Sequence, residues 1–281
     1  MAESPPDTET HAAPARREPA TLHENPVLCL AGMHRSGTSL VMSWLEAAGL
    51  RIDNGDRLGA DHGNERGHYE DKQFVGFHSG LISTRWPRSW GWKAAPTRPL
   101  AFNDEQRERA RRIVRQRDSE PGAWGWKDPR TCLFLDAWKQ VLPRMRVLGV
   151  WRPCEEVVRS LRGRARHRRD RVSAVSIPLG VRLWVSHNRL LLRHAARHPE
   201  TTALVELGTI LADETPVVRC LTKDLGIQLQ PPPFKSLYES GLIGPSVHSA
   251  AVRAAMRFYG VETLTRALRA QSLRAKRSVT P

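Results

Sequence analysis

The clearest structural signal in the chain is the stretch VLCLAGMHRSGTS, residues 27–39. Its apolar start is typical of a buried parallel strand, and residues 38–48 have the apolar spacing of a helix that Gly49 ends. Between them, Gly32 and Gly37 have the GxxxxG spacing of a phosphate-binding loop. Such a loop aims backbone N–H groups and a helix N-terminus at phosphate oxygens. We therefore predict an anion site between the first strand and the first helix.

Strands and helices alternate along the rest of the chain. Further buried strands are expected at 146–151 and 203–207, and helices at 103–118 and 179–198, among others. The polar, Gly-rich stretch 51–80 is predicted to be loop with short helices. This alternation indicates an α/β fold, with a doubly wound parallel sheet covered by helices on both faces.

The size of the chain favours one folded domain. It has 281 residues, 40% of them hydrophobic, which is enough for a single α/β core. Residues 1–26 contain no aromatic residue and are expected to be a disordered tail. The domain is expected to span 27–275, followed by a basic tail at 276–281. No secretion signal and no membrane-spanning run is found, and the four cysteines form no CxxC pair, so a cytoplasmic protein with reduced thiols is predicted.

The chain is strongly basic, with a formal net charge of +15. A basic surface favours anionic ligands without choosing among them. The arginine-rich stretch 159–171 is either a solvated helix face or a surface that attracts an anionic ligand. Nucleic acid is not expected as a partner, because no aromatic residues are interleaved with these arginines.

Two departures from the nucleotide triphosphatase pattern suggest different chemistry. Thr38 stands where such an enzyme has its phosphate-loop Lys, and Arg35 lies earlier in the loop instead. The strand at 146–151 is followed by Arg152 rather than by a metal-binding Asp. A positive charge there suits an anion directly, so we expect no metal. Ser160, eight residues later, can face the same side of the following helix.

The run HRSGTS, residues 34–39, resembles the 5′-phosphosulfate loop of sulfotransferases. The spacing of Arg152 and Ser160 resembles the 3′-phosphate site of the same family. The resemblance implies a P-loop-type sulfotransferase fold and 3′-phosphoadenosine-5′-phosphosulfate as co-substrate. It also implies that Arg35 lies at the sulfuryl group, and that Arg152 and Ser160 bind the 3′-phosphate. The co-substrate-binding loop would consist of His34, Arg35, Ser36, Gly37, Thr38 and Ser39, the last three at the 5′-phosphate.

The run GWKDPR, residues 125–130, resembles the KDP segment of a bacterial sulfotransferase branch. This implies that Lys127 is a second cation near the sulfonate, stabilising charge that develops on the leaving phosphate. Asp128 would orient Lys127 or cap the next helix. The alternative interpretation is a helix-initiating turn with solvated charges.

Residues 64–71, NERGHYED, resemble the NPxGxxE stretch of the same branch. Transfer to a hydroxyl needs a base near the acceptor oxygen. Glu70 is the preferred base and His68 the second choice, although His62, Glu65 and Asp71 have suitable side chains.

These signals predict metal-independent transfer of a sulfuryl group to a hydroxyl or amine. The acceptor is expected to be a small molecule or a carbohydrate, with no membrane partner. Two alternatives remain: a P-loop small-molecule kinase, and a non-catalytic basic module that binds anions or nucleic acid.

Overall fold

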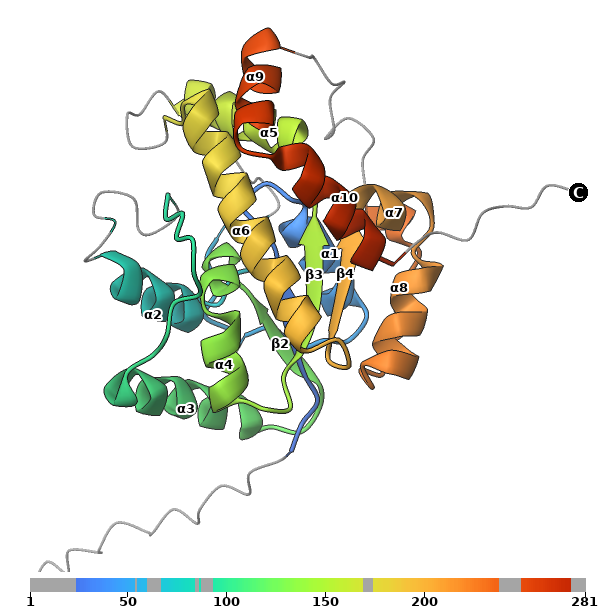
Figure 1. Cartoon of the computed structure of the whole chain (residues 1–281). Helices are drawn as coiled ribbons and strands as arrows, with labels where there is room; N and C mark the ends of the chain where they lie inside the picture. The colour runs from blue at the N-terminus through green and yellow to red at the C-terminus, as the bar shows by residue number, and fades with distance from the viewer. Residues whose placement is uncertain are drawn as a thin grey trace, which may run out of the picture.

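A four-stranded parallel sheet lies at the centre of the molecule (Figure 1). The computed structural model describes residues 24–53, 55–59, 67–83, 86, 93–168, 174–237 and 249–273, without the side chains of 164–168. Within these residues the strand order is β2-β1-β3-β4. The strands are β1 (Val27–Ala31), β2 (Trp124–Lys127), β3 (Arg146–Trp151) and β4 (Thr202–Glu206).

Helices connect the strands and continue beyond the last one. Those of the N-terminal half are α1 (Thr38–Ala47), α2 (Lys72–Ser83), α3 (Asp104–Asp118), the 3₁₀ turn η1 (Pro129–Leu133) and α4 (Leu135–Val141). Those of the C-terminal half are α5 (Cys154–Arg168), α6 (Ile177–Arg197), α7 (Leu207–Ala212), α8 (Thr215–Arg219), the π-helical η2 (Cys220–Asp224), the 3₁₀ turn η3 (Phe234–Leu237), α9 (Ala250–Phe258) and α10 (Val261–Gln271).

Successive residues of each strand point to opposite faces of the sheet, and each face has its own core. Cys29 and Val147 pack in a cluster with apolar residues of α2, α4 and α6. Leu28 and Leu148 belong to a second cluster with apolar residues of α1, α7 and η2. Both faces are therefore covered, which confirms the predicted α/β architecture.

The register brings the carboxyl ends of three strands together. Leu30 of β1 pairs with Lys127 of β2, and Ala31 pairs with Gly149 of β3. Open α/β sheets bind ligands outside the carboxyl ends of their strands. The loop after β1, the end of β2 and the residue after β3 therefore face the same region.

Two elements differ from the sequence expectation. The stretch 51–80 was expected to be loop with short helices, but Lys72–Ser83 is a 12-residue helix. Its apolar face buries Phe74 and Phe77, and Phe74 stacks on Trp126 of β2 with ring centroids 4.6 Å apart. Strand β2 itself was not predicted, because a four-residue run has too little periodicity to be recognised.

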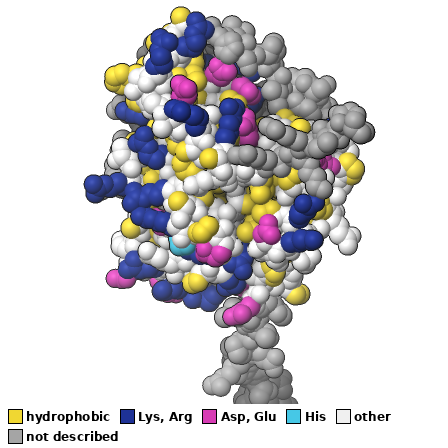
Figure 2. Space-filling model, turned by 45° about the vertical axis from the view of Figure 1, so that its right-hand side comes forward, with side chains coloured by type: hydrophobic (Ala, Val, Ile, Leu, Met, Phe, Trp, Pro, Cys, Tyr) yellow, Lys and Arg dark blue, Asp and Glu magenta, His cyan; other side chains and the backbone are white. Residues whose placement is uncertain are grey.

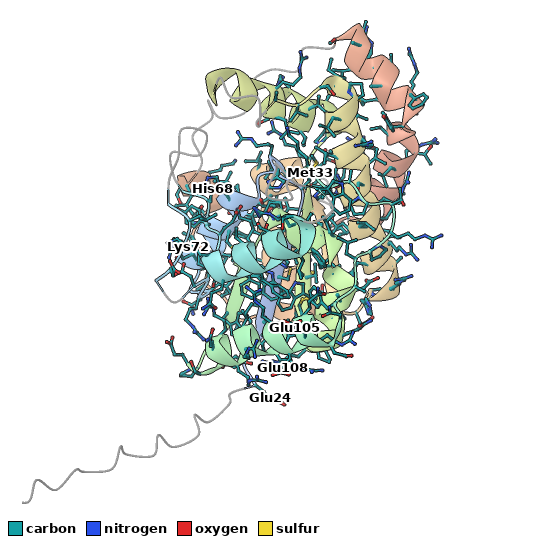
Figure 3. The ribbon with its side chains drawn as sticks, turned by 90° about the vertical axis from the view of Figure 1, so that its left-hand side faces the viewer. Glu24, Met33, His68, Lys72, Glu105 and Glu108 are labelled. Atoms are coloured by element: carbon teal, nitrogen blue, oxygen red, sulfur yellow. The ribbon has the colours of Figure 1, made fainter. Side chains whose placement is uncertain are left out.

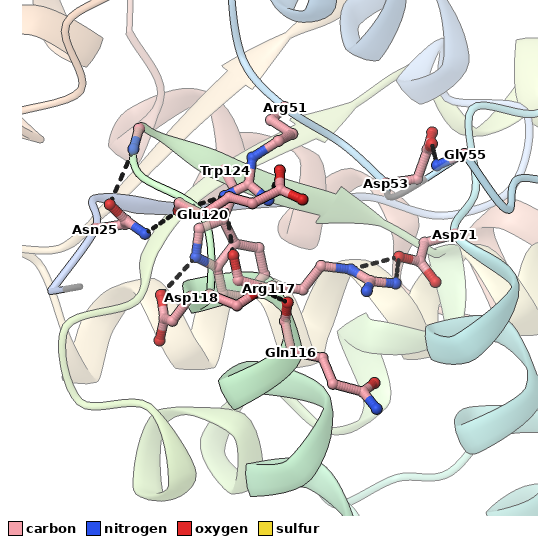
Figure 4. A network of polar contacts seen from close by, with 12 residues as sticks. Asn25, Arg51, Asp53, Gly55, Asp71, Gln116, Arg117, Asp118, Glu120 and Trp124 are labelled. Carbon is pink, nitrogen blue, oxygen red and sulfur yellow. Dashed lines mark hydrogen bonds and ion pairs between the residues drawn. The ribbon is translucent and has the colours of Figure 1, made fainter. Parts of the chain in front are cut away.

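The described chain begins before the predicted domain boundary. Asn25 is buried; its Nδ2 donates to the carbonyl of Glu120 at 2.8 Å and its Oδ1 accepts from the amide of Gly122 at 3.0 Å (Figure 4). Residues 1–23 and 274–281 lie outside the described residues, so the two predicted tails stay predictions.

Among the helices that the structure describes, none is both long enough and apolar enough to cross a bilayer. All four cysteines are buried and free.

Candidate active site

The loop after β1 is shaped by two glycines. A Cβ on Gly32 would lie 2.4 Å from the carbonyl oxygen of Val150 and 2.7 Å from Cγ2 of Thr38. Gly37 has a φ of 86°, and a Cβ there would meet the Leu207 side chain at 2.6 Å. Only glycine fits both positions without rearrangement, since L side chains avoid this φ and close backbone approach excludes a methyl group.

The N-terminus of α1 is suited to an anion. Its N-cap is Gly37, which has no side chain to accept from the first amides, and its first turn contains no acidic residue. In contrast, α3 closes its own N-terminus with a capping box between Asn103 and Gln106. Within the described residues, the buried Oγ of Ser36 also has no hydrogen-bond partner. An anion at this place would satisfy donors that the fold leaves available.

Arg35 links the loop to the helix that follows β3. Its backbone is left-handed, with a φ of 69°, and its Nε donates to Oγ of Ser160 at 2.8 Å. These two residues are 125 positions apart in the sequence. The structure thus brings the two predicted anion-binding segments into direct contact.

Arg152 follows β3 directly and is only 8% exposed. Its Nε donates to Oε2 of Glu156 at 2.6 Å, and its carbonyl accepts from the indole of Trp184 at 2.8 Å. An ion pair with a glutamate of α5 is what a purely structural arginine would form. However, it uses one of the five N–H groups of a guanidinium, so it does not exclude a phosphate contact.

Lys127 lies between the loop and the predicted base. Its Nζ donates to Oε1 of Glu70 at 2.7 Å and to Oγ of Ser39 at 3.1 Å. Lys127 is 2% exposed and Glu70 is 6% exposed. The charge of Lys127 is therefore buried, unlike the solvated charges of the alternative interpretation. Three predicted site residues from separate parts of the chain therefore meet here.

The other candidate bases differ in their surroundings. The carbonyl of His68 accepts from Oγ of Ser39 at 3.2 Å, so its segment borders the loop. Asp71 pairs with buried Arg117 (Figure 4) and caps α2 through the amide of Gln73, which makes it structural. His62 and Glu65 lie outside the described residues.

The loop and the His68 segment lie away from helix α3. In Figure 3, Met33 and His68 are at a similar height, whereas Glu105 and Glu108 of α3 lie lower in the view. The carboxyl ends of the strands account for the place of the loop, because the loop follows β1.

His34 adds no positive charge to the loop at neutral pH. Burial, helped by the nearby charge of Arg130, lowers the pKa of His34 well below its ordinary value. Burial also lowers the pKa of His187, whose ring centroid lies 6.4 Å away, to about 4. Both rings are therefore neutral at pH 7.

Sequence reasoning missed two buried polar residues beside Lys127. Arg130 donates to Oδ1 of Asp128 from its amide at 3.0 Å and from Nη1 at 2.5 Å, while Oδ2 of Asp128 contacts Nδ1 of His78 at 2.8 Å. Burial opposes ionisation of Asp128, but Arg130 and His78 outweigh it and hold its pKa below the ordinary value. Arg130 was visible in the KDPR run, whereas His78 lay in a stretch expected to be loop.

A separate group of side chains, Asp136, His194 and His198, has the composition of a metal site. The carboxylate of Asp136 accepts from Nδ1 of His194 at 2.7 Å and from Nη1 of Arg197 at 2.5 Å. The hydrogen bond from His194 and the ion pair with Arg197 account for the position of Asp136.

A solved sulfotransferase shares this fold. No protein-family model matches the chain, and no curated protein matches it. The sulfotransferase from Alicyclobacillus acidocaldarius has a TM-score of 0.50 at 13% identity, covering 88% of this chain and 95% of that one. The sulfotransferase STF1 from Mycobacterium tuberculosis H37Rv (TM-score 0.49, 16% identity) covers 88% of this chain and 77% of its own. The sulfotransferase domain of the Synechococcus PCC 7002 olefin synthase (0.49, 15%) covers 91% and 98%.

At this identity the likeness concerns the fold alone, and the first of these structures carries it. The chain has the parallel α/β architecture of a sulfotransferase. The roles of individual residues rest on their geometry and on the motifs.

Proposed function

We propose that this protein is a metal-independent sulfotransferase that uses 3′-phosphoadenosine-5′-phosphosulfate. The observation that carries the proposal is the 2.8 Å contact between Arg35 and Ser160. It joins a phosphate loop after β1 to an Arg152–Ser160 segment after β3, the two segments expected to bind the two ends of one co-substrate. The sulfotransferase-like fold supports the same conclusion.

We assign the 5′-phosphate to the N-terminus of α1, with Gly37, Thr38 and Ser39. The 3′-phosphate is assigned to Arg152 and Ser160. His34 and Ser36 complete the loop as neutral groups. The co-substrate supplies an activated sulfuryl group whose bond to the 5′-phosphate breaks during transfer.

The chemistry needs a base and cations. Glu70 would take the proton of the acceptor hydroxyl while the hydroxyl oxygen forms its bond to sulfur. His68 is the second candidate for this base. Arg35 and Lys127 would stabilise negative charge that grows on the leaving phosphate oxygen. The contacts of Lys127 support this division, because its Nζ donates both to Glu70 and to Ser39 of the loop.

Thermal unfolding tests the proposal. Adenosine 3′,5′-bisphosphate at about 100 times its Kd should stabilise the folded state by about 2.7 kcal/mol, since it binds only that state. The shift should persist in EDTA. The matched ligands are adenosine 5′-phosphate, ATP with Mg²⁺, and an oligonucleotide.

The two alternatives give different outcomes in this experiment. A kinase would be stabilised most by ATP with Mg²⁺, and a nucleic-acid-binding module by the oligonucleotide. Loss of the bisphosphate shift in EDTA would contradict metal independence. Radiolabelled donor with pools of phenols, carbohydrates and amines would then identify the acceptor.

A further inference from the structure

A buried chain of hydrogen bonds runs from α4 to the turn that follows Lys127. The indole Nε1 of Trp138 donates to Nε2 of His78 at 2.8 Å, and Nδ1 of His78 contacts Oδ2 of Asp128 at 2.8 Å. The other oxygen of Asp128 accepts from Arg130. His78 and Asp128 are both fully buried.

These hydrogen bonds indicate which tautomer His78 adopts. An indole N–H can only donate, so Nε2 of His78 must be the acceptor. In a neutral imidazole the proton is then on Nδ1, which donates to the Asp128 carboxylate. A protonated ring would place a second N–H against the indole of Trp138. The two contacts therefore fit one tautomer of His78, with the proton on Nδ1.

His78 also provides a second attachment between two parts of the candidate site. Helix α2 begins at Lys72, two residues after Glu70, and carries His78 nearly two turns later. Glu70 contacts Lys127, and His78 contacts Asp128, the next residue. The ring of His78 is held by aromatic neighbours, including Phe134, which stacks on it at 5.5 Å. The orientation of Glu70 against Lys127 thus has a rigid support.

We propose that His78 is a positioning residue for sulfuryl transfer: as the neutral Nδ1–H tautomer set by Trp138, it holds the Lys127–Arg130 turn through Asp128 and so fixes Lys127 against Glu70. This inference rests on the proposed function. The ionised state of Asp128 supports it, because Arg130 and His78 outweigh the effect of burial on its pKa.

The tautomer can be measured without any substitution. Long-range ¹H–¹⁵N spectra of the histidine rings distinguish Nδ1–H, Nε2–H and imidazolium forms, with His78→Asn used to assign the signals. We expect His78 to be Nδ1–H at pH 7. An Nε2–H or imidazolium signal would overturn the proposal.

Two substitutions separate positioning from packing. His78→Asn keeps an N–H donor near the place of Nδ1, whereas His78→Leu keeps apolar volume and loses the donor. Positioning predicts that the Leu variant turns over about tenfold more slowly than the Asn variant at saturating donor, while both bind the bisphosphate within about twofold of wild type. A purely structural role predicts the reverse order, because Leu suits an aromatic pocket better than a partly unpaired amide.

The chain contains a matched control. His194 is equally buried and pairs with Asp136 at 2.7 Å. It lies near the end of α6, which leads into the start of β4, so it belongs to the opposite end of the sheet from the loop. His194→Asn and His194→Leu should have equal turnover.

The outcomes separate the two proposals. If wild type binds the bisphosphate and transfers sulfuryl but the Asn and Leu variants of His78 turn over equally, the positioning role is wrong and the function stands. An equal Asn–Leu difference at His194 would also overturn it. If wild type neither binds the bisphosphate nor transfers label, the proposed function fails and the positioning role fails with it, whatever the tautomer.

Discussion

The candidate cations each have a protein partner, so donor binding would exchange contacts rather than create them. A hydrogen bond to a charged group contributes about 1.5–3 kcal/mol net, and the net value falls when an internal partner must be displaced. A side chain that keeps its internal hydrogen bond and uses another N–H group for the ligand does not lose this free energy. The three contacts are Arg35–Ser160, Arg152–Glu156 and Lys127–Glu70.

Arg152→Ala should weaken the binding of adenosine 3′,5′-bisphosphate by about 10- to 150-fold. This range corresponds to the free energy of one charge-assisted hydrogen bond. The affinity for adenosine 5′-phosphate, which lacks the 3′-phosphate, should change little. Titration calorimetry with both ligands measures the difference. Arg107→Ala, which breaks an exposed pair with Asp104 on α3, is the control. An equal loss for both ligands would mean that Arg152 is not at the 3′-phosphate.

Arg35→Ala and Lys127→Ala should each lower kcat about 100-fold, the scale of a single oxyanion donor, with a smaller loss of bisphosphate affinity. Contacts made mainly in the transition state reduce turnover more than ground-state binding. Arg35→Lys should recover part of the rate, because the charge is kept.

Ser160→Ala should instead raise the KM for the donor. Normal turnover of Lys127→Ala at saturating donor would show that the KDPR turn is structural.

At the scale of elements, local signals predicted some parts of the fold and not others. The β1–loop–α1 unit and helix α3 were predicted, because glycine spacing and helical sequence patterns act within a few positions. Helix α2 was not, since Gly76 and Gly80 lower its helix propensity and its stability comes from docking on β2.

The same distinction applies to the candidate site. Lys127 and Glu70 were each predicted from a motif. Their 2.7 Å contact was not, because it depends on how α2 docks against β2. His78 had no sequence signal at all, since a buried neutral histidine is recognised only from its partners Trp138 and Asp128.

The close approach of Gly32 to the backbone of Val150 can be tested by substitution. Gly32→Ala should destabilise the protein by about 1–3 kcal/mol, because the new methyl group meets the backbone of Val150 and overpacking has this cost. Gly208→Ala in α7 meets nothing within 4 Å and should be neutral or stabilising by up to about 1 kcal/mol. Urea unfolding measures both. Equal stability of the two variants would show that the close approach at Gly32 is not a constraint.

The whole molecule carries a formal net charge of +15. Lys and Arg side chains are spread widely over the described part of the face in Figure 2, with fewer acidic ones. A field of one sign raises the encounter rate of ligands of the opposite sign, and salt screens it beyond a Debye length of about 10 Å at 0.1 M. A multiply anionic donor is such a ligand.

Raising the salt concentration should therefore lower kcat/KM for the donor and leave kcat nearly unchanged. Steering acts on encounter, whereas Lys127 and Glu70, both buried, are screened much less. Initial rates over a range of NaCl concentrations measure both parameters, and KM for an uncharged acceptor should stay constant as the internal control. A fall in kcat with constant kcat/KM would mean that salt weakens the buried contacts instead, so the surface charge would have no role in capturing the donor.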